Sequence, residues 1–338
     1  DTDGHWAEEF ICWMSDQGIV GGYPDGTFKP GNKVTRAELS VIVNNLNDHV
    51  VDTTYTQAEV DALLAAQESR IAALEAKLAA VSVENGGEDV VFNGVNLHIR
   101  DGSGTTTGTV TGLGNLIIGY NEDQGGDATR TGSHNLIIGP EHTYTDFGGL
   151  VVGYEHTLGG RYASITGGYM NVTSANFASV GGGSYNEAGG SYTSISGGMY
   201  NIVTGQSSSI SGGRSNSVTG EVSSICGGRD NVASGYFTSV SGGEGNQASD
   251  YYTSVSGGGY NTADGSNAMV CGGSGNTASG SFSAVSGGQN NTASGTYSSV
   301  SGGGDNIASG SRSSVSGGDT HEASGDYDWR AGSLFEDQ

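Results

Sequence analysis

The stretch "VSGGQNNTASGTYSS" at Val285–Ser299 is followed at once by "VSGGGDNIASGSRSS", which starts at Val300. The first residue of this phrase is aliphatic and recurs eleven times at a strict period of 15. The column contains Ile165, Val180, Ile195, Ile210, Ile225, Val240, Val255, Val270, Val285, Val300 and Val315. Because a disordered Gly/Ser linker would not hold a β-branched residue in register, the period predicts an ordered array in which each unit forms one coil.

Each repeated position has a physical role in a β-solenoid. The aliphatic residue points into the coil, and the Gly-Gly pair that follows allows a tight corner. Six residues after the aliphatic position an asparagine recurs, which either stacks on its neighbours as an amide ladder or bonds its own turn. This column contains Asn171, Asn186, Asn201, Asn216, Asn231, Asn246, Asn261, Asn276, Asn291 and Asn306, and His321 replaces it in the last unit.

Three other uses of glycine-rich repeats fit the sequence poorly. Calcium-binding nonapeptide repeats need an aspartate at a fixed place, and the aspartates of this chain do not hold one position. An ice-binding face needs a regular threonine row, and only Thr262, Thr277 and Thr292 align in their column. No Gly-Lys-Ser/Thr follows any glycine pair, which argues against phosphate-binding loops.

A single coil contains little apolar material. Fixing its backbone costs about 1–2 kcal/mol per residue, and one buried valine or isoleucine returns only about 1.5–3 kcal/mol. We therefore expect other chains, packed side by side, to supply the missing burial. This reasoning predicts an oligomer.

Residues 113–328 follow the pattern "S-V-S-G-G-x-x-N-x-A-S-G-x-Y-S", with a less regular start at "GNLIIGY", "HNLIIGP" and "GLVVGYEHT". This pattern resembles the head repeats of trimeric autotransporter adhesins, the YadA-like heads. The resemblance implies a left-handed parallel β-roll and three chains packed around one axis. The unit of 15 residues is a departure from that family.

The segment 59–83 changes abruptly in composition and places residues of an apolar seam at alternating spacings of four and three. Such spacing is the a/d seam of a coiled coil, in which one polar member sets the register. The seam contains Val60, Leu64, Gln67, Ile71, Leu74, Leu78 and Val81. The alternative is a lone amphipathic helix that packs on a domain. The repeats downstream favour a parallel seam of three chains.

The first 47 residues combine two helical patterns with a turn at Tyr23–Gly26, and a T-x-x-E capping box at Thr35 and Glu38 opens the second helix. The phrases "GHWAEEFI" and "GIVGGYPDGTFKPGNKVTRAEL" closely resemble the S-layer homology module. The resemblance implies noncovalent binding to a cell-wall polysaccharide or to peptidoglycan. Carried over by motif, the binding residues are Arg36 for the anionic ligand, Trp6 as an apolar wall, and Asp3, Gly22 and Lys29 in the matching pocket segments.

The alternatives for this module are a plain surface role for Arg36 and core packing for Trp6 and Trp13. We interpret Thr35 and Glu38 as structural caps.

The composition limits the possible partners. With 12 Lys and Arg against 36 Asp and Glu, the formal net charge of −24 disfavours nucleic acid and anionic lipid. No apolar run is long enough to span a bilayer. Three cysteines without a CxxC pair argue against a disulfide scaffold or a zinc site. Because no G-x-S-x-G, HExxH or Cys/His pattern is present, we expect no enzyme, no cofactor and no metal.

These observations predict a multidomain chain. Its parts are an S-layer homology module (1–47), a linker (48–58), a coiled coil (59–83), a β-rich neck (84–112), a β-roll or β-solenoid (113–328) and a tail (329–338).

We expect an extracellular homotrimer of the bacterial cell surface, exported with its leader removed, whose module anchors a rigid shaft for adhesion or surface-layer assembly. The alternative is a self-polymerising filament or lattice subunit, in which the module docks on a neighbouring trimer. In the tail, Trp329, Leu334 and Phe335 either cap the last coil or insert into such a neighbour. We expect Cys226 and Cys271 to be small buried thiols, and bridges to symmetry-related chains stay open.

Overall fold

The computed structural model describes residues 8–21, 35–53, 56–123 and 129–332. The chain divides into two compact units, Asp1–Leu97 and His98–Gln338. Six of the predicted site residues lie outside the described residues: Asp3, Trp6, Gly22, Lys29, Leu334 and Phe335.

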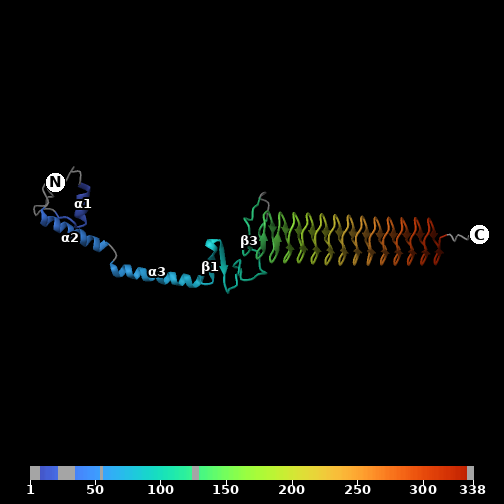
Figure 1. Ribbon diagram of the computed structural model, residues 1–338, viewed down its shortest axis with the longest axis horizontal. Coiled ribbons are helices and arrows are strands. Elements are labelled where there is room, and N and C mark those ends of the chain that lie inside the picture. The colour runs from blue at the N-terminus through green and yellow to red at the C-terminus, as the bar shows by residue number, and fades with distance from the viewer. Residues whose placement is uncertain (1–7, 22–34, 54–55, 124–128, 333–338) are drawn as a thin grey trace, which may run out of the picture. The chain divides into compact units, whose positions relative to one another are not determined.

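The described part of the first unit contains helices followed by a β-hairpin (Figure 1). Its helices are α1 (Glu8–Asp16), α2 (Arg36–Thr53) and α3 (Gln57–Leu78). Strands β1 (Val81–Glu84) and β2 (Asp89–Phe92) pair antiparallel across the short 3-10 helix η1 (Asn85–Gly87). Helix α2 runs through 48–53, so most of the segment that we expected to be a linker is helical.

Two of these helices begin at a capping box. The Thr35 N–H donates to Glu38 Oε2 at 2.7 Å, and the Glu38 N–H donates back to Thr35 Oγ1 at 3.2 Å. Thr56 and Glu59 repeat the motif before α3. Each box satisfies backbone N–H groups that a helix start leaves without intrahelical partners.

The second unit is dominated by a parallel β-solenoid, in which each coil adds one strand to each of two sheets (Figure 1). Strand partners in the regular part lie 15 residues apart, so Val180 is level with Ile165 and Ile195. A third side of the coil is joined by single-residue bridges such as that between Tyr169 and Ser184. The structure therefore contains a long β-solenoid, as the period predicts.

The first sheet, which we call the valine sheet after its interior Ile/Val column, has 15 strands. They are β3 (Leu116–Ile118), β4 (Leu136–Ile138), β6 (Leu150–Val152), β8 (Ser164–Ile165), β10 (Ser179–Val180), β12 (Ser194–Ile195), β14 (Ser209–Ile210), β16 (Ser224–Ile225), β18 (Ser239–Val240), β20 (Ser254–Val255), β22 (Met269–Val270), β24 (Ala284–Val285), β26 (Ser299–Val300), β28 (Ser314–Val315) and β30 (Trp329–Arg330).

The second sheet, which we call the alanine sheet after its most frequent interior residue, has 13 strands. They are β5 (Thr143–Tyr144), β7 (Thr157–Leu158), β9 (Val172–Thr173), β11 (Glu187–Ala188), β13 (Ile202–Val203), β15 (Ser217–Val218), β17 (Val232–Ala233), β19 (Gln247–Ala248), β21 (Thr262–Ala263), β23 (Thr277–Ala278), β25 (Thr292–Ala293), β27 (Ile307–Ala308) and β29 (Glu322–Ala323).

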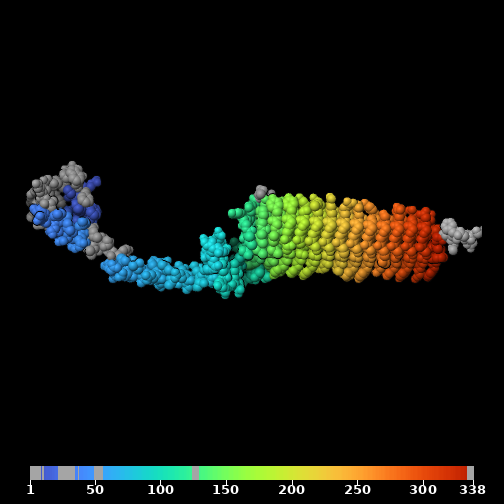
Figure 2. Space-filling view, in the orientation of Figure 1, coloured from blue at the N-terminus to red at the C-terminus, as the bar shows by residue number. Residues whose placement is uncertain are grey.

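The interior of each regular coil is closed within one chain. All eleven residues of the predicted aliphatic column have 0% exposure, and the ten asparagines are at most 1% exposed. The alanine column and a column of small Ser, Thr and Ala side chains fill the rest of the interior. Figure 2 shows successive coils in unbroken contact along the stack. The burial that we expected other chains to supply is therefore not missing inside the coil.

Left-handed backbone conformations turn the chain between the sides of each coil. Gly198 has a φ of 95°, and a Cβ at this position would lie 2.2 Å from the carbonyl oxygen of Gly213 in the next coil. Other corners hold non-glycine residues, such as Tyr192 with a φ of 60°. Its ring stacks on that of Phe177 with centroids 4.9 Å apart. The two rings therefore contact each other face to face across adjacent coils.

Both ends of the solenoid depart from the repeat. Val151 pairs with Ile137 and with Ile165, so the two coils between them contain 14 residues. At the far end, β30 pairs with β28, and Trp329 therefore belongs to the valine sheet rather than following the last coil. Trp329 is 64% exposed and donates from Nε1 to Ser316 Oγ at 2.9 Å, so its ring lies on the outer face rather than over the open end.

Candidate functional site

Arg36 is the predicted wall-binding residue that falls within the described residues. It is the first residue of α2, directly after the capping threonine, and its side chain is exposed. The positive end of the helix macrodipole and the guanidinium group both favour an anionic ligand at this position. The capping box fixes the backbone on which Arg36 stands.

The described core of this module is small. Ile19 has 0% exposure and Val20 has 7%, and the Asn45 Nδ2 atom donates to the Ile19 carbonyl at 3.0 Å. This hydrogen bond ties α2 to the segment that follows α1. Trp13 is 49% exposed, so the alternative of core packing does not describe this residue.

The heptad seam of α3 is exposed in the single chain. Leu64, Ile71, Leu74 and Leu78 are each more than half exposed, and α3 has no buried residue. Gln67 is also exposed, whereas Val60 and Val81 are half-buried. The alternative of a helix packed on its own domain is not what the structure shows, because the apolar face of α3 is uncovered.

The asparagine column forms a continuous hydrogen-bonded ladder. The Asn201 N–H donates to Asn186 Oδ1 at 3.1 Å. Its side-chain Nδ2 donates to the carbonyl of Gly197 in the same coil at 3.2 Å and to that of Gly213 in the next coil at 3.0 Å. Both interpretations of this column therefore hold at once, since each amide joins adjacent coils and closes its own turn. These contacts hold the coils in register.

Two histidines replace asparagine in the 14-residue coils. His142 and His156 are at most 1% exposed, and their rings stack with centroids 5.3 Å apart. Nδ1 of His142 accepts the His156 N–H at 3.2 Å, and Nδ1 of His156 accepts the Asn171 N–H at 3.0 Å. The ladder thus continues through imidazole nitrogens, and a ring nitrogen that accepts an N–H carries no proton.

Burial is the largest cause that shifts the pKa of both rings downward. Together with the adjacent His142 ring, burial lowers the pKa of His156 to about 4. Burial and the Arg130 guanidinium lower the pKa of His142. Our sequence reasoning missed this pair. The available signal was a histidine in the asparagine column at each point where the period shortens.

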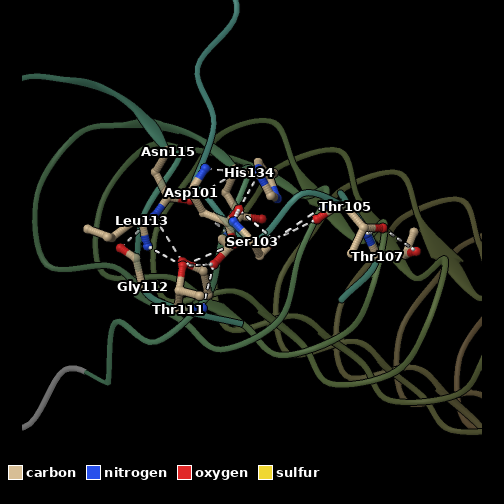
Figure 3. Close-up of polar contacts among 12 residues, drawn as sticks. Asp101, Ser103, Thr105, Thr107, Thr111, Gly112, Leu113, Asn115 and His134 are labelled. Carbon is tan, nitrogen blue, oxygen red and sulfur yellow. Dashed lines mark hydrogen bonds and ion pairs between the residues drawn. The ribbon is translucent and has the colours of Figure 1, made fainter. Parts of the chain in front are cut away.

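A polar cluster precedes the first strand of the solenoid (Figure 3). The Asp101 carboxylate accepts from the Ser103 N–H at 2.9 Å, from the Ser103 hydroxyl at 2.7 Å and from the Thr111 hydroxyl at 3.1 Å. His134 Nε2 lies 3.5 Å from the same carboxylate. The Ser103 hydrogen bonds are the main cause that lowers the pKa of Asp101. The cluster folds the segment before β3 onto the start of the array and is structural.

The thiols differ from our expectation. Cys226 and Cys271 are free and exposed rather than buried, because each follows an interior residue of the valine sheet and therefore points outward. Among the described residues, no group of three or more His, Cys, Asp or Glu side chains is placed to hold a metal ion. No helix within the described ranges has the length and apolar character needed to cross a bilayer.

The geometry is that of a modular protein in which a small helical module precedes a long parallel β-solenoid. The module is an S-layer homology domain, since residues 1–40 match the model of that family.

Similar proteins share this N-terminal part. Cell surface glycoprotein 1 of Acetivibrio thermocellus is 50% identical over 44 residues, which are 13% of this chain and 2% of that protein. Outer membrane protein SlpA of Deinococcus radiodurans is 35% identical over 80 residues, 24% of this chain and 7% of that protein. The cellulosome-anchoring protein of Acetivibrio thermocellus is 48% identical over 40 residues, 12% of this chain and 9% of that protein. The chain spans less than a tenth of the length of these relatives.

Proposed function

We propose that this protein is a noncatalytic structural protein of the bacterial cell surface, held to a wall polymer by its N-terminal module. The observation that carries the proposal is the S-layer homology domain joined to a long array of similar coils. S-layer and cell-surface relatives share that module. The solenoid is long and regular, and these properties suit a structural shaft.

The wall-binding residues of this proposal are Arg36, Trp6, Asp3, Gly22 and Lys29. Arg36 is exposed beside a helix N-terminus, where a guanidinium can hold a carboxylate or phosphate of the polymer in a bidentate manner. A pyruvylated polysaccharide or peptidoglycan has the required negative charge.

The shaft in this proposal is a homotrimer. The uncovered seam of α3, with Leu64 and Leu74 each 56% exposed, supports a parallel coiled coil. The hairpin behind it also exposes apolar side chains, including Val83 at 65% and Val90 at 60%. Copies that pack together would remove this surface from water. The seam alone sets no stoichiometry, and three chains follow from the resemblance to trimeric head repeats.

A filament subunit is the second candidate function. One observation favours it: β3 is a terminal strand of the valine sheet, and its Leu116, Ile117 and Ile118 are all exposed. An unpaired apolar edge invites pairing with another chain. Electron microscopy of the purified protein separates the two functions, because end-to-end polymers support the filament and isolated rods support the wall-anchored spike.

The anchoring role is tested by co-sedimentation with peptidoglycan sacculi that retain their secondary polymers. We expect Arg36→Ala to reduce the bound fraction strongly, whereas Arg70→Ala on the exposed surface of α3 should bind like the wild type. Equal binding by Arg36→Ala and the wild type would reject the role given to Arg36. Failure of the wild type to bind would reject wall anchoring.

A further inference from the structure

The outer face of the valine sheet is free of charge from β3 to β28, and the exposed Arg330 of β30 lies at its end. Successive residues of a strand point to opposite faces, so the residues on either side of each interior residue point outward. From β3 to β28, none of these outward residues is charged. In the regular coils most of them are serines, such as Ser194 and Ser196 around Ile195. The alanine sheet differs, since Glu187, Asp264 and Glu322 lie on its outer face.

The same face is apolar at its start. The outward residues of the first three strands are Leu116, Ile118, Leu136, Ile138, Leu150 and Val152. Leu116 is 42% exposed and Ile118 is 53% exposed, and the other four are partly exposed. Of the middle residues of these strands, Ile137 and Val151 are fully buried, whereas Ile117 is 39% exposed. An exposed apolar strip that continues into an uncharged one is typical of an interaction surface.

A column of glycines borders this face, and about half of its members have no reason for glycine inside the chain. The second residue after the aliphatic position is glycine in all eleven units. At Gly197, Gly212 and Gly227, a Cβ would meet nothing within 4 Å, and their φ angles lie outside the left-handed region. Neither space nor backbone conformation within one chain therefore requires glycine at these three positions, or at Gly167, Gly272 and Gly287. The other five members of the column have φ angles of 144° to 157°, which favour glycine by themselves. A neighbouring molecule that approaches the backbone closely would require glycine at the former positions.

We propose that this face packs against the same face of the other copies of the chain around a common axis, in parallel and in register. The proposal rests on the oligomeric shaft described above and names its contact surface. Chains with a net charge of −24 repel one another, and an uncharged face is where they can meet at the lowest electrostatic cost.

The size of the face suits this role. Fifteen strands span fourteen spacings of about 4.8 Å, so a width of about 10 Å gives about 670 Å² per copy, somewhat below the roughly 800 Å² that each partner buries in a standard interface. Serine and glycine allow the two sheets to approach closely. The exposed seam of α3 supplies further area in the same chain.

Two native thiols report on the arrangement, because Cys226 and Cys271 both lie on this face and are exposed. In a parallel, in-register packing, each would face its own counterpart. We therefore expect a short bismaleimide to join the chains through Cys226–Cys226 and Cys271–Cys271 links in a Cys12→Ser background.

The matched control places the only cysteine on the other sheet. It is a Cys12→Ser/Cys226→Ser/Cys271→Ser variant that also carries Ser234→Cys. Ser234 is exposed, belongs to the same coil as Cys226 and follows β17 of the alanine sheet. This control should remain uncrosslinked.

Charge insertion gives an independent measurement. Ser286→Glu/Ser301→Glu places carboxylates on the valine sheet, and Ser294→Glu/Ser309→Glu places them at the same coils beside the alanine sheet. We expect the first pair to lower the oligomer fraction measured by light scattering and the second pair to leave it unchanged.

The outcomes separate this inference from the proposed shaft. An oligomer in which Cys226 stays uncrosslinked, or in which Ser234→Cys links instead, overturns the face and leaves the oligomeric shaft standing. A monomer in solution overturns both, whereas wall binding through Arg36 is measured separately. Crosslinks at both native thiols, with the control unlinked, support the proposal.

Discussion

Acidification should open the first coils of the solenoid before it affects the regular ones. In the folded chain His156 is buried and neutral, since its Nδ1 accepts the Asn171 N–H. Its Nε2 has no hydrogen-bond partner among the described residues. A proton added to Nδ1 would break the ladder at this point and leave a charge in an apolar interior. Protonation therefore requires local opening.

The magnitude follows from the pKa of His156. Burial lowers it from the ordinary value of 6.5 to about 4. Because the folded pKa lies below the unfolded one, the stability is fully present above about pH 6.5 and is lost as the pH falls toward 4. The full difference corresponds to about 3 kcal/mol, or roughly a 300-fold change in the opening equilibrium, of which about half is reached at pH 4. His142, whose pKa is also lowered, adds to the effect in the same direction.

Hydrogen exchange measured by mass spectrometry can resolve this opening. The peptide 142–171 contains the two histidines, and the peptide 270–300 contains regular coils and serves as an internal reference. Their ratio removes most of the intrinsic pH dependence of exchange. Between pH 7 and pH 4 we expect protection of the first peptide to fall by up to about a hundredfold relative to the second.

Variants at two histidines test the cause. His156→Gln keeps a polar side chain without a titrating ring, so it should flatten most of the pH dependence while lowering stability at pH 7. His98→Gln removes an exposed histidine and should behave like the wild type. An unchanged protection ratio across this pH range, or a pH dependence that persists in His156→Gln, would refute the reasoning.

Three further predictions concern the coils and the helix seam. Gly198→Ala should lower the urea midpoint of unfolding, because the new Cβ would meet the backbone of the next coil, and we expect the free energy of unfolding to fall by about 2–4 kcal/mol. Gly197→Ala is the control and should leave the stability of the coil nearly unchanged, because a Cβ there meets nothing within 4 Å. Asn231→Ala should cost about 3–5 kcal/mol in the same measurement, since it leaves two carbonyls and the Asn246 N–H without their side-chain partner. Ile71→Asp should shift the mass measured by light scattering toward the monomer, and Ser69→Asp on the same helix should not; equal masses for both variants would contradict the seam.

The regular coils could be predicted from the sequence because one period determines which residues are buried and which residues of adjacent coils lie level with one another. A strict spacing of 15 puts every aliphatic residue inside and every asparagine level with the next, and those are the contacts that the structure shows at Ile195 and Asn201. The first coils could not be predicted in this way. There the spacing changes to 14, and the role of His156 depends on a corner that lacks one glycine.

Surface roles were harder to predict than interior ones. Our reasoning that each coil lacks burial was wrong for the interior, because small side chains fill a coil this narrow. The exposure of Cys226 follows from the alternation of side chains along β16. The serines at the equivalent positions of other coils did not indicate whether that position faces the interior or the solvent. The binding role proposed for Arg36 rests on the sequence pattern, because Asp3, Trp6, Gly22 and Lys29 lie outside the described residues.

The ladder has a direction, and this makes the length of the shaft adjustable. Each asparagine accepts the N–H of the next one along the chain, so the last one, Asn306, presents its oxygen to His321. Because every regular unit presents the same oxygen to the next unit and the same N–H to the previous one, removing or inserting a whole unit would leave the ladder closed. The solenoid can therefore act as a molecular ruler, and inserting or deleting units of 15 residues would change its reach in steps of about 4.8 Å.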